Sequence, residues 1–178
     1  MVKTQTPVVK DGWMMKEFCL PDFDGKKISL LDSVGQNGTV VAFICNHCPY
    51  VKEIIDPFCK CAEKLQKLGV NVVAVMPNDF IQYPQDSPEK MKEFAAEHLF
   101  SFPYLVDKSQ NVAKEYDAVC TPDFFGFDGK KQLRYRGCFI NKKTNNEDLF
   151  DAMTQIAKDS CTSVVQFPSI GCSIKWKS

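Results

Sequence analysis

Two nearly continuous apolar runs with a helical pattern between them most constrain the fold of this chain. The runs cover residues 39–44 and 70–76, and each has the length and composition of a strand buried on both faces. Residues 49–68 place apolar side chains at helical spacing, and Gly69 ends that pattern. A strand, a helix and a second strand in this order predict a crossover unit and therefore an α/β fold.

The remaining segments extend this unit into a larger sheet. We expect an N-terminal hairpin within residues 18–31. Further elements are expected as follows: a helix that opens at Pro88 after a cap at Asp86 or Ser87, a strand at 103–106, a helix at 109–116, a hairpin at 123–139 and a helix at 147–158. The 178 residues predict one domain, with its core at about 18–158. The tail, residues 159–178, predicts no element of its own.

Charge and hydropathy exclude several classes of function. Lys plus Arg and Asp plus Glu both number 22, so no basic excess indicates nucleic acid or an anionic membrane. No apolar run approaches the roughly 18 residues of a membrane helix, and the N-terminus lacks the apolar core of a secretory signal. The nine cysteines, an odd number, are poor evidence for a disulfide framework. We therefore expect a cytoplasmic protein.

The motif Cys45-Asn46-His47-Cys48 lies where the first apolar run meets the helix. Unpaired N–H groups in the first turn of a helix stabilise a thiolate, which lowers the pKa of a cysteine there from about 8.5 towards roughly 3.5–7.5. The second thiol lies one turn away and can close a disulfide with the first. We expect Cys45 to be the exposed thiolate that attacks, Cys48 to resolve the mixed disulfide, and the charge of His47 to help stabilise Cys45.

A second polar pair follows the other buried strand. Ligands of α/β sheets bind at the carboxyl ends of the strands. Cys45 lies beyond one such end, and Asn78-Asp79 lies beyond the next. We therefore expect Asn78 and Asp79 to modulate the chemistry of the cysteine pair.

Joined to Thr121-Pro122 at the later hairpin, these motifs resemble the thioredoxin superfamily, and more closely its redoxin or AhpC/TSA (thiol-specific antioxidant) branch of peroxiredoxin-like proteins. The likeness covers roughly residues 18–158. It implies a thioredoxin-like fold: a central mixed sheet flanked by helices, with an N-terminal hairpin. It also implies that the peptide bond before Pro122 is cis, and that Thr121 and Pro122 hold an extended partner chain beside the cysteines.

The same resemblance implies a thiol–disulfide oxidoreductase without a prosthetic group. Its substrate would be a protein or small-molecule disulfide or thiol, and its electron donor a thiol such as thioredoxin or glutathione. Two alternatives stay open. In a peroxiredoxin-like thiol peroxidase Cys48, which precedes Pro49, would be the peroxidatic cysteine, although Cys45 and Val41 replace the Thr and Pro expected before it. The other alternative is a non-catalytic thioredoxin-fold binding module.

The other cysteines suggest a metal site or further redox residues. Cys45, Cys48, Cys59 and Cys61 resemble paired zinc ligands. In a helix, however, Cys48 and Cys59 lie about 16 Å apart, so we expect no metal.

Cys120 and Cys172 are candidate extra redox residues, because Cys120 closely precedes Pro122 and Cys172 lies in the tail. We expect the tail to anchor around residues 167–176, with Lys175, Lys177 and Ser178 exposed. If it docks at the site, Cys172 reaches Cys45 or Cys48.

Overall fold

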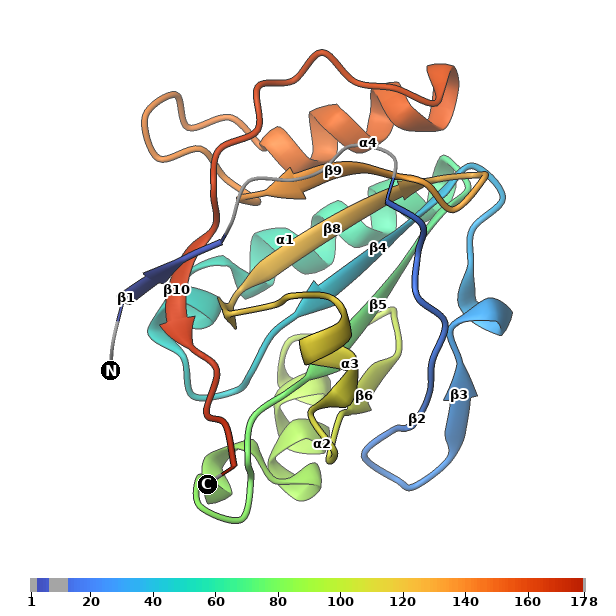
Figure 1. Cartoon of the computed structure of the whole chain (residues 1–178). Coiled ribbons are helices and arrows are strands. Elements are labelled where there is room, and N and C mark those ends of the chain that lie inside the picture. Colours follow the sequence, from blue (N-terminus) through green and yellow to red (C-terminus); the bar gives the residue numbers. More distant parts are fainter. Residues whose placement is uncertain (1–2, 7–12, 178) are drawn as a thin grey trace.

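The computed structural model describes residues 3–6 and 13–177, and its centre is a five-stranded mixed sheet (Figure 1). The strand order is β6–β5–β4–β8–β9. Strand β5 (Val70–Met76) pairs in parallel with β4 (Gly38–Phe43) and β6 (Tyr104–Val106). Strand β8 (Asp123–Asp128) pairs antiparallel with β4, and β9 (Leu133–Gly137) antiparallel with β8. The predicted thioredoxin-like α/β fold is confirmed.

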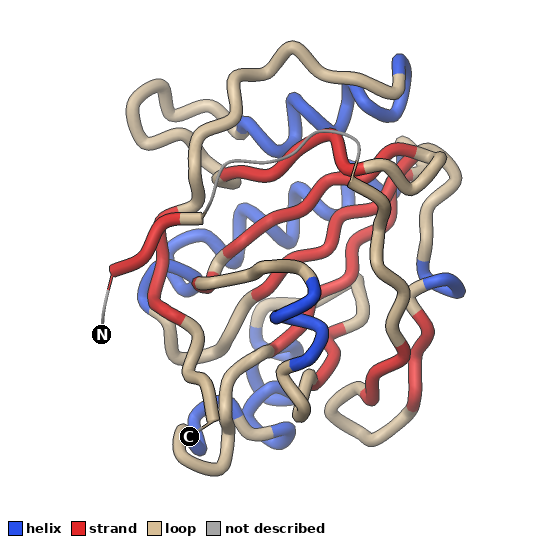
Figure 2. Tube along the Cα trace, in the orientation of Figure 1, coloured by secondary structure: helices blue, strands red, loops and turns tan. Residues whose placement is uncertain are grey.

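Helices cover both faces of this sheet (Figures 1 and 2). One face carries α1 (Pro49–Lys67), α2 (Pro88–Glu97) and α4 (Asp148–Asp159), and the other carries α3 (Asn111–Glu115). Successive side chains of β4 point to opposite faces of the sheet. Val40 therefore lies in the hydrophobic core on the α1 side, and Val41 lies in the core on the α3 side. Both faces of β4 are thus buried, which explains its nearly continuous apolar sequence.

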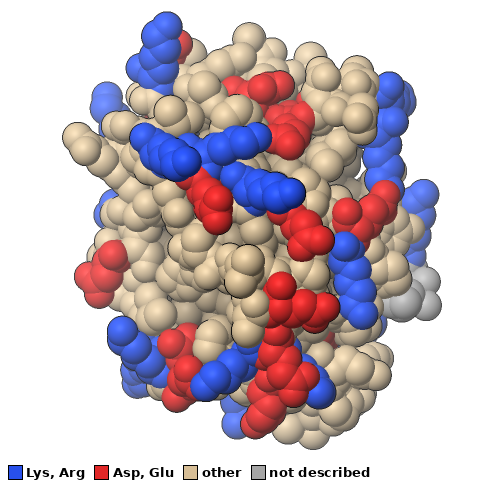
Figure 3. Space-filling view, turned by 180° about the vertical axis from the view of Figure 1, so that it is seen from behind, with Lys and Arg blue, Asp and Glu red and all other residues tan. Residues whose placement is uncertain are grey.

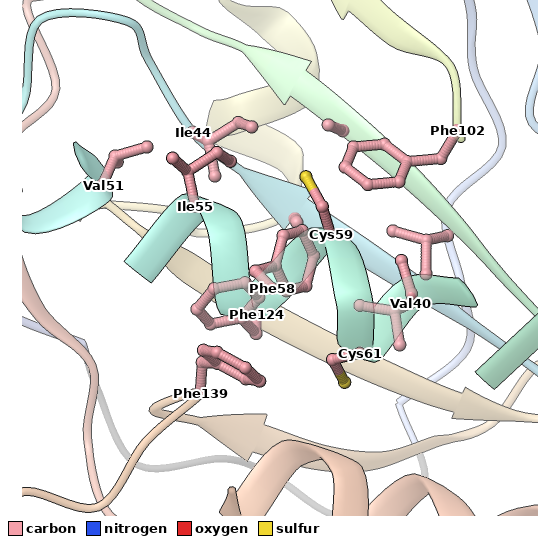
Figure 4. Close-up of a cluster of buried hydrophobic side chains, with 14 of the residues drawn as sticks. Val40, Ile44, Val51, Ile55, Phe58, Cys59, Cys61, Phe102, Phe124 and Phe139 are labelled. Atoms are coloured by element: carbon pink, nitrogen blue, oxygen red, sulfur yellow. The ribbon is translucent and has the colours of Figure 1, made fainter. Parts of the chain in front are cut away.

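Phe58 fixes α1 against the sheet. Its ring centroid lies 5.6 Å from that of Phe102, 5.1 Å from Phe124 and 5.6 Å from Phe139 (Figure 4). Edge-to-face and tilted aromatic pairs at these distances stabilise the packing beyond the area they bury. The start of α1 therefore has a fixed position at the end of β4.

The predicted N-terminal hairpin is confirmed, with strands β2 (Cys19–Pro21) and β3 (Lys27–Ser29) paired antiparallel. The prediction for the tail is wrong, because it contains a strand, β10 (Ile170–Ser173). This strand lies between β1 (Lys3–Gln5) and β7 (Cys120–Thr121) and is antiparallel to both. Backbone pairing with distant strands creates β10, so the sequence of the tail carries little sign of it.

The anchoring of the tail differs in part from the prediction. Cys172 and Ile174 are buried, whereas Phe167 and Trp176 are 36% and 39% exposed. Lys177 is exposed as predicted, but Lys175 is half-buried because its backbone is hydrogen-bonded to the end of β5. Ser178 lies outside the described residues.

The surface seen from behind carries positive and negative side chains interspersed (Figure 3). This pattern agrees with the formal net charge of zero and differs from the single-sign patch of a nucleic-acid-binding surface. Among the described residues, no helix combines the length and apolar character needed to cross a membrane.

Candidate active site

The two motif cysteines lie in the turn between β4 and α1. Cys48 is the N-cap of α1, and its carbonyl oxygen accepts hydrogen bonds from the N–H groups of Val51 and Lys52, both at 3.0 Å. Cys45 is 1% exposed and Cys48 is 0% exposed. The predicted exposure of Cys45 is therefore wrong, because Thr121 packs directly against both thiols.

Thr121 and Pro122 face the motif, and the peptide bond between them is cis, which confirms that prediction. The Sγ atom of Cys45 lies 3.2 Å from Oγ1 of Thr121, within hydrogen-bonding distance. When it is protonated, the Cys48 thiol donates to the carbonyl oxygen of Thr121 over 3.2 Å. Thr121 thus contacts one thiol with its side chain and the other with its backbone.

A third thiol completes the cluster. The Sγ atoms of Cys48 and Cys172 lie 3.0 Å apart, although 124 positions separate the two residues in the chain. Cys172 is on β10, opposite Thr121 in the antiparallel register. Of the two candidate extra redox residues, Cys172 therefore contacts the pair directly.

Cys48, not Cys45, is the thiol with the lowered pKa. A hydrogen bond from Cys45, with others from Cys172 and the Val51 N–H, outweighs burial and lowers the pKa of Cys48 to about 5. Burial, the hydrogen bond with Cys48 and the charge of Asp86 raise the pKa of Cys45 well above its usual value. These shifts favour Cys48 as the thiolate, whereas the sequence predicts the thiolate at Cys45.

This assignment predicts how the reduced protein titrates. The ultraviolet absorbance of thiolates is measured against pH in the wild-type protein and in Cys48→Ser. We expect the difference between the two to rise with a midpoint at pH about 5. Because the pKa is lowered, the thiolate is present above this pH and is lost as the pH falls through it. In Cys45→Ala the hydrogen bond that lowers the pKa most is removed, so the midpoint should rise. A wild-type midpoint near about 8.5, the value of an ordinary cysteine, would contradict the assignment.

A buried carboxylate, Asp86, organises the polar side of the site, a role that no sequence pattern indicates. Its Oδ1 accepts the backbone N–H of Asn46 at 2.9 Å. Its Oδ2 lies 2.6 Å from Nδ1 of His47 and accepts from the Asn78 amide at 2.8 Å. The Asp86 side chain is 0% exposed. The sequence offered Asp86 only as a helix cap, whereas Ser87 is the actual cap of α2.

Asn78 and Asp79 have different places. Asn78 reaches the site through Asp86, and its Oδ1 also accepts the backbone N–H of Lys175 at 2.9 Å. The backbone N–H of Asp79 donates to the Lys175 carbonyl at 2.9 Å. Both residues therefore hold the C-terminal segment, and only Asn78 is also linked to the polar network beside the cysteines.

The three other buried cysteines differ from the central three. Cys120 is fully buried, and burial raises its pKa. Cys59 and Cys61 project from different sides of α1 into the hydrophobic core (Figure 4), and burial raises the pKa of each to about 12. Thiols in such surroundings stay protonated and are poor metal ligands.

Within residues 3–6 and 13–177, one set of donor atoms is close enough for a metal ion. Ligand atoms of Cys45, His47 and Asp86 lie within 4.8 Å of one another. Each is already engaged within the protein, since Cys45 contacts Thr121 and Asp86 bonds with both His47 and Asn78. The arrangement can move a proton between these groups without any ion.

A cavity of about 300 Å³ has Pro122 in its wall. Its apolar wall includes Phe124, Phe139 and Ile170 of β10, and Lys142 lies at its edge. An apolar side chain next to a reactive disulfide would fit such a cavity.

Known proteins share this sequence and architecture. Residues 12–145 match the model of the AhpC/TSA family. Peroxiredoxin Bcp of Escherichia coli (strain K12) is 26% identical over 153 residues, which cover 80% of this chain and 86% of that protein. Thiol-disulfide oxidoreductase YkuV of Bacillus subtilis (strain 168) is 30% identical over 125 residues, which cover 65% of this chain and 80% of that protein.

A crystal structure of an uncharacterized conserved protein from Geobacillus kaustophilus superposes with a TM-score of 0.93. It is 40% identical, and the match covers 99% of this chain and 97% of that one. The family match spans well over half of the sequence and agrees with the thioredoxin-like fold and the clustered thiols. The chain therefore belongs to the AhpC/TSA family.

Proposed function

We propose that this protein is a thiol–disulfide oxidoreductase that acts through Cys45 and Cys48. The observation that carries the proposal is the contact between a stabilised thiolate and a second thiol. Cys48 has a pKa of about 5, and the Cys45 thiol is hydrogen-bonded to it. A nucleophilic sulfur with another thiol in contact is suited to form a mixed disulfide and then resolve it.

The reaction has two exchange steps. The Cys48 thiolate attacks one sulfur of the substrate disulfide, and the other sulfur leaves as a thiolate that takes up a proton. Cys45 then loses its proton and attacks Cys48, which forms the Cys45–Cys48 disulfide and releases the second substrate thiol. A thiol donor of the thioredoxin or glutathione class restores the dithiol, and no prosthetic group takes part.

The residues around the pair supply a partner edge and a proton acceptor. The backbone of Thr121, in contact with Cys48, offers the edge on which an extended substrate pairs, and the cavity beside Pro122 takes one of its apolar side chains. The His47–Asp86 pair lies within 4.8 Å of the Cys45 sulfur and accepts its proton in the second step. The nine cysteines, an odd number, favour a reducing, cytoplasmic compartment for this chemistry.

A peroxidase is the second candidate, and one observation favours it. Cys48 has the lowered pKa of a peroxidatic cysteine and precedes Pro49. A peroxidase also needs a hydroxyl and an arginine free to polarise the peroxide beside the reactive cysteine. Cys45 stands where a hydroxyl is expected, and the Arg136 guanidinium pairs with Asp123 at 2.8 Å and lies over the Phe125 ring. Disulfide exchange is therefore the better-supported function.

Two assays on the same preparation test the proposal. We expect the protein to catalyse reduction of insulin disulfides by a thiol donor, because Cys48 and Cys45 together complete both exchange steps. Stopped-flow oxidation by hydrogen peroxide should be as slow as for a free thiol. Fast peroxide oxidation that survives Cys45→Ser but not Cys48→Ser would replace the proposal by the peroxidase. Inactivity in both assays would favour a binding module.

A further inference from the structure

Strand β10 occupies the edge on which the proposed function requires a substrate to pair. Cys172 lies opposite Thr121, and Ser173 lies opposite Cys120, in antiparallel register. Thr121 directly precedes Pro122 and contacts both catalytic thiols. Figure 1 shows β10 running beside the start of β8, at the end of the central sheet. An external extended chain cannot pair with β7 while β10 remains there.

The sulfur of this strand lies where the sulfur of a bound substrate must lie. Cys172 Sγ is 3.0 Å from Cys48 Sγ, and a disulfide bond of about 2.05 Å needs only about 1 Å of further approach. The neighbouring Gly171 permits this closeness, because a Cβ atom there would lie 2.1 Å from the Thr121 carbonyl oxygen. The pair Gly171-Cys172 thus brings the strand and its thiol close to Cys48.

We propose that β10 is an internal substrate strand, and that Cys172 exchanges with the Cys45–Cys48 disulfide to form a Cys48–Cys172 disulfide that closes the site. The proposal rests on the function proposed above. It gives the oxidised protein two forms with the same number of electrons. In one form β10 is held by noncovalent contacts alone, and in the other it is bonded to Cys48.

The exchange balances without an added oxidant. Cys172 loses its proton and attacks Cys48 Sγ, so that the Cys48–Cys172 bond forms and the Cys45–Cys48 bond breaks. Cys45 leaves as a thiolate and takes up the proton that Cys172 gave up. Burial raises the pKa of both Cys172 and Cys45. The thiolate form is therefore not strongly favoured at the attacking sulfur or at the leaving sulfur.

The contacts around β10 allow it to leave when it is not bonded to Cys48. Beyond Cys172 the segment is held chiefly by polar groups that water can replace. Lys175 bonds through its backbone with Asn78, Asp79 and Gln110, and Lys177 donates its N–H to Gln110 Oε1 at 2.8 Å. Ile174 is the buried apolar anchor, while Trp176 stays exposed. An external substrate therefore competes with β10 for the same edge.

The decisive experiment isolates Cys48 and Cys172 in the full chain. Cys45→Ser is equilibrated with oxidised glutathione, acid-quenched, alkylated and peptide-mapped. We expect the Cys48–Cys172 disulfide to dominate, because Cys172 displaces glutathione from Cys48. The double variant Cys45→Ser/Cys172→Ser should instead keep glutathione on Cys48, and Cys45→Ser/Cys161→Ser, which removes an exposed tail cysteine, should behave like Cys45→Ser. Glutathione retained on Cys48 of Cys45→Ser, with Cys172 free for alkylation, would overturn the proposal.

A second measurement tests the closing role of the strand. Gly171→Ala should displace β10 and raise the rate of Cys48 alkylation in the reduced protein at least about tenfold, because a buried thiol reacts only through local opening. An unchanged alkylation rate in a folded variant would overturn the closure.

The proposed function is tested separately on the wild-type protein. If it cannot form the Cys45–Cys48 disulfide or reduce insulin, the oxidoreductase assignment fails. The mapping on Cys45→Ser still decides whether Cys172 reaches Cys48.

Discussion

Cys48→Ser is expected to lower the rate of insulin reduction by at least about a thousandfold, to the level of the thiol donor alone. Cys48 carries the stabilised thiolate, and the sulfur that remains, Cys45, is buried with a raised pKa. A protonated thiol does not attack a disulfide. The measurement is the initial rate of insulin reduction over a range of protein concentrations.

The matched control keeps Cys48 and removes the two thiols in contact with it. Cys45→Ser/Cys172→Ser should also lose turnover, but it should accumulate a stable mixed disulfide with a peptide disulfide, detectable by intact mass. Cys48→Ser should accumulate none. If Cys48→Ser forms the adduct and the double variant does not, Cys45 is the attacking residue, as the sequence alone predicted.

The central fold could be predicted because its patterns are long and local. β4 and β5 read as continuous apolar runs, and α1 carries an apolar stripe over 19 residues between them. Strands β1, β7 and β10 have two to four residues each, and each forms through backbone bonds to partners far away in the sequence. Side-chain periodicity cannot reveal such strands.

The residues of the candidate site also separate into those that a local sequence motif marks and those that it does not. Cys45, Cys48, Thr121 and Pro122 were found because two short motifs mark them, and the structure brings them together. Asp86 acts on Asn46 and His47 across 40 and 39 positions of sequence, and its neighbour Ser87 supplied the expected cap. The sequence places the lower pKa at Cys45, whereas hydrogen bonds from Cys45 and Cys172 lower the pKa of Cys48, and the spacing of the motif carries no sign of a partner on β10.

The second large effect concerns stability. At about pH 9, Arg136→Met is expected to lower the free energy of unfolding by about 3–5 kcal/mol, the usual cost of leaving a buried charge without its partner. Arg136 donates to Asp123 Oδ2 at 2.8 Å, and the Asp123 side chain is 0% exposed. Asp123 directly follows Pro122. The loss is measured by urea unfolding monitored by circular dichroism.

The pH dependence and a matched arginine on the same strand test this explanation. Burial, offset in part by Arg136, raises the pKa of Asp123 from 3.8 to about 7. The folded state therefore keeps a proton that the unfolded chain has lost, and stability falls as the pH rises from about 4 to about 7. Without Arg136 the fall should continue above pH 7, so the variant should be least stable in alkaline buffer.

Arg134→Met should lower the free energy of unfolding less, by about 1 kcal/mol. In that variant Asp128 still accepts hydrogen bonds from the backbone N–H groups of Lys130 and Gln132, both at 2.9 Å. Equal losses in both variants, independent of pH, would show that the arginine stems stabilise β9 by packing rather than by neutralising a buried carboxylate.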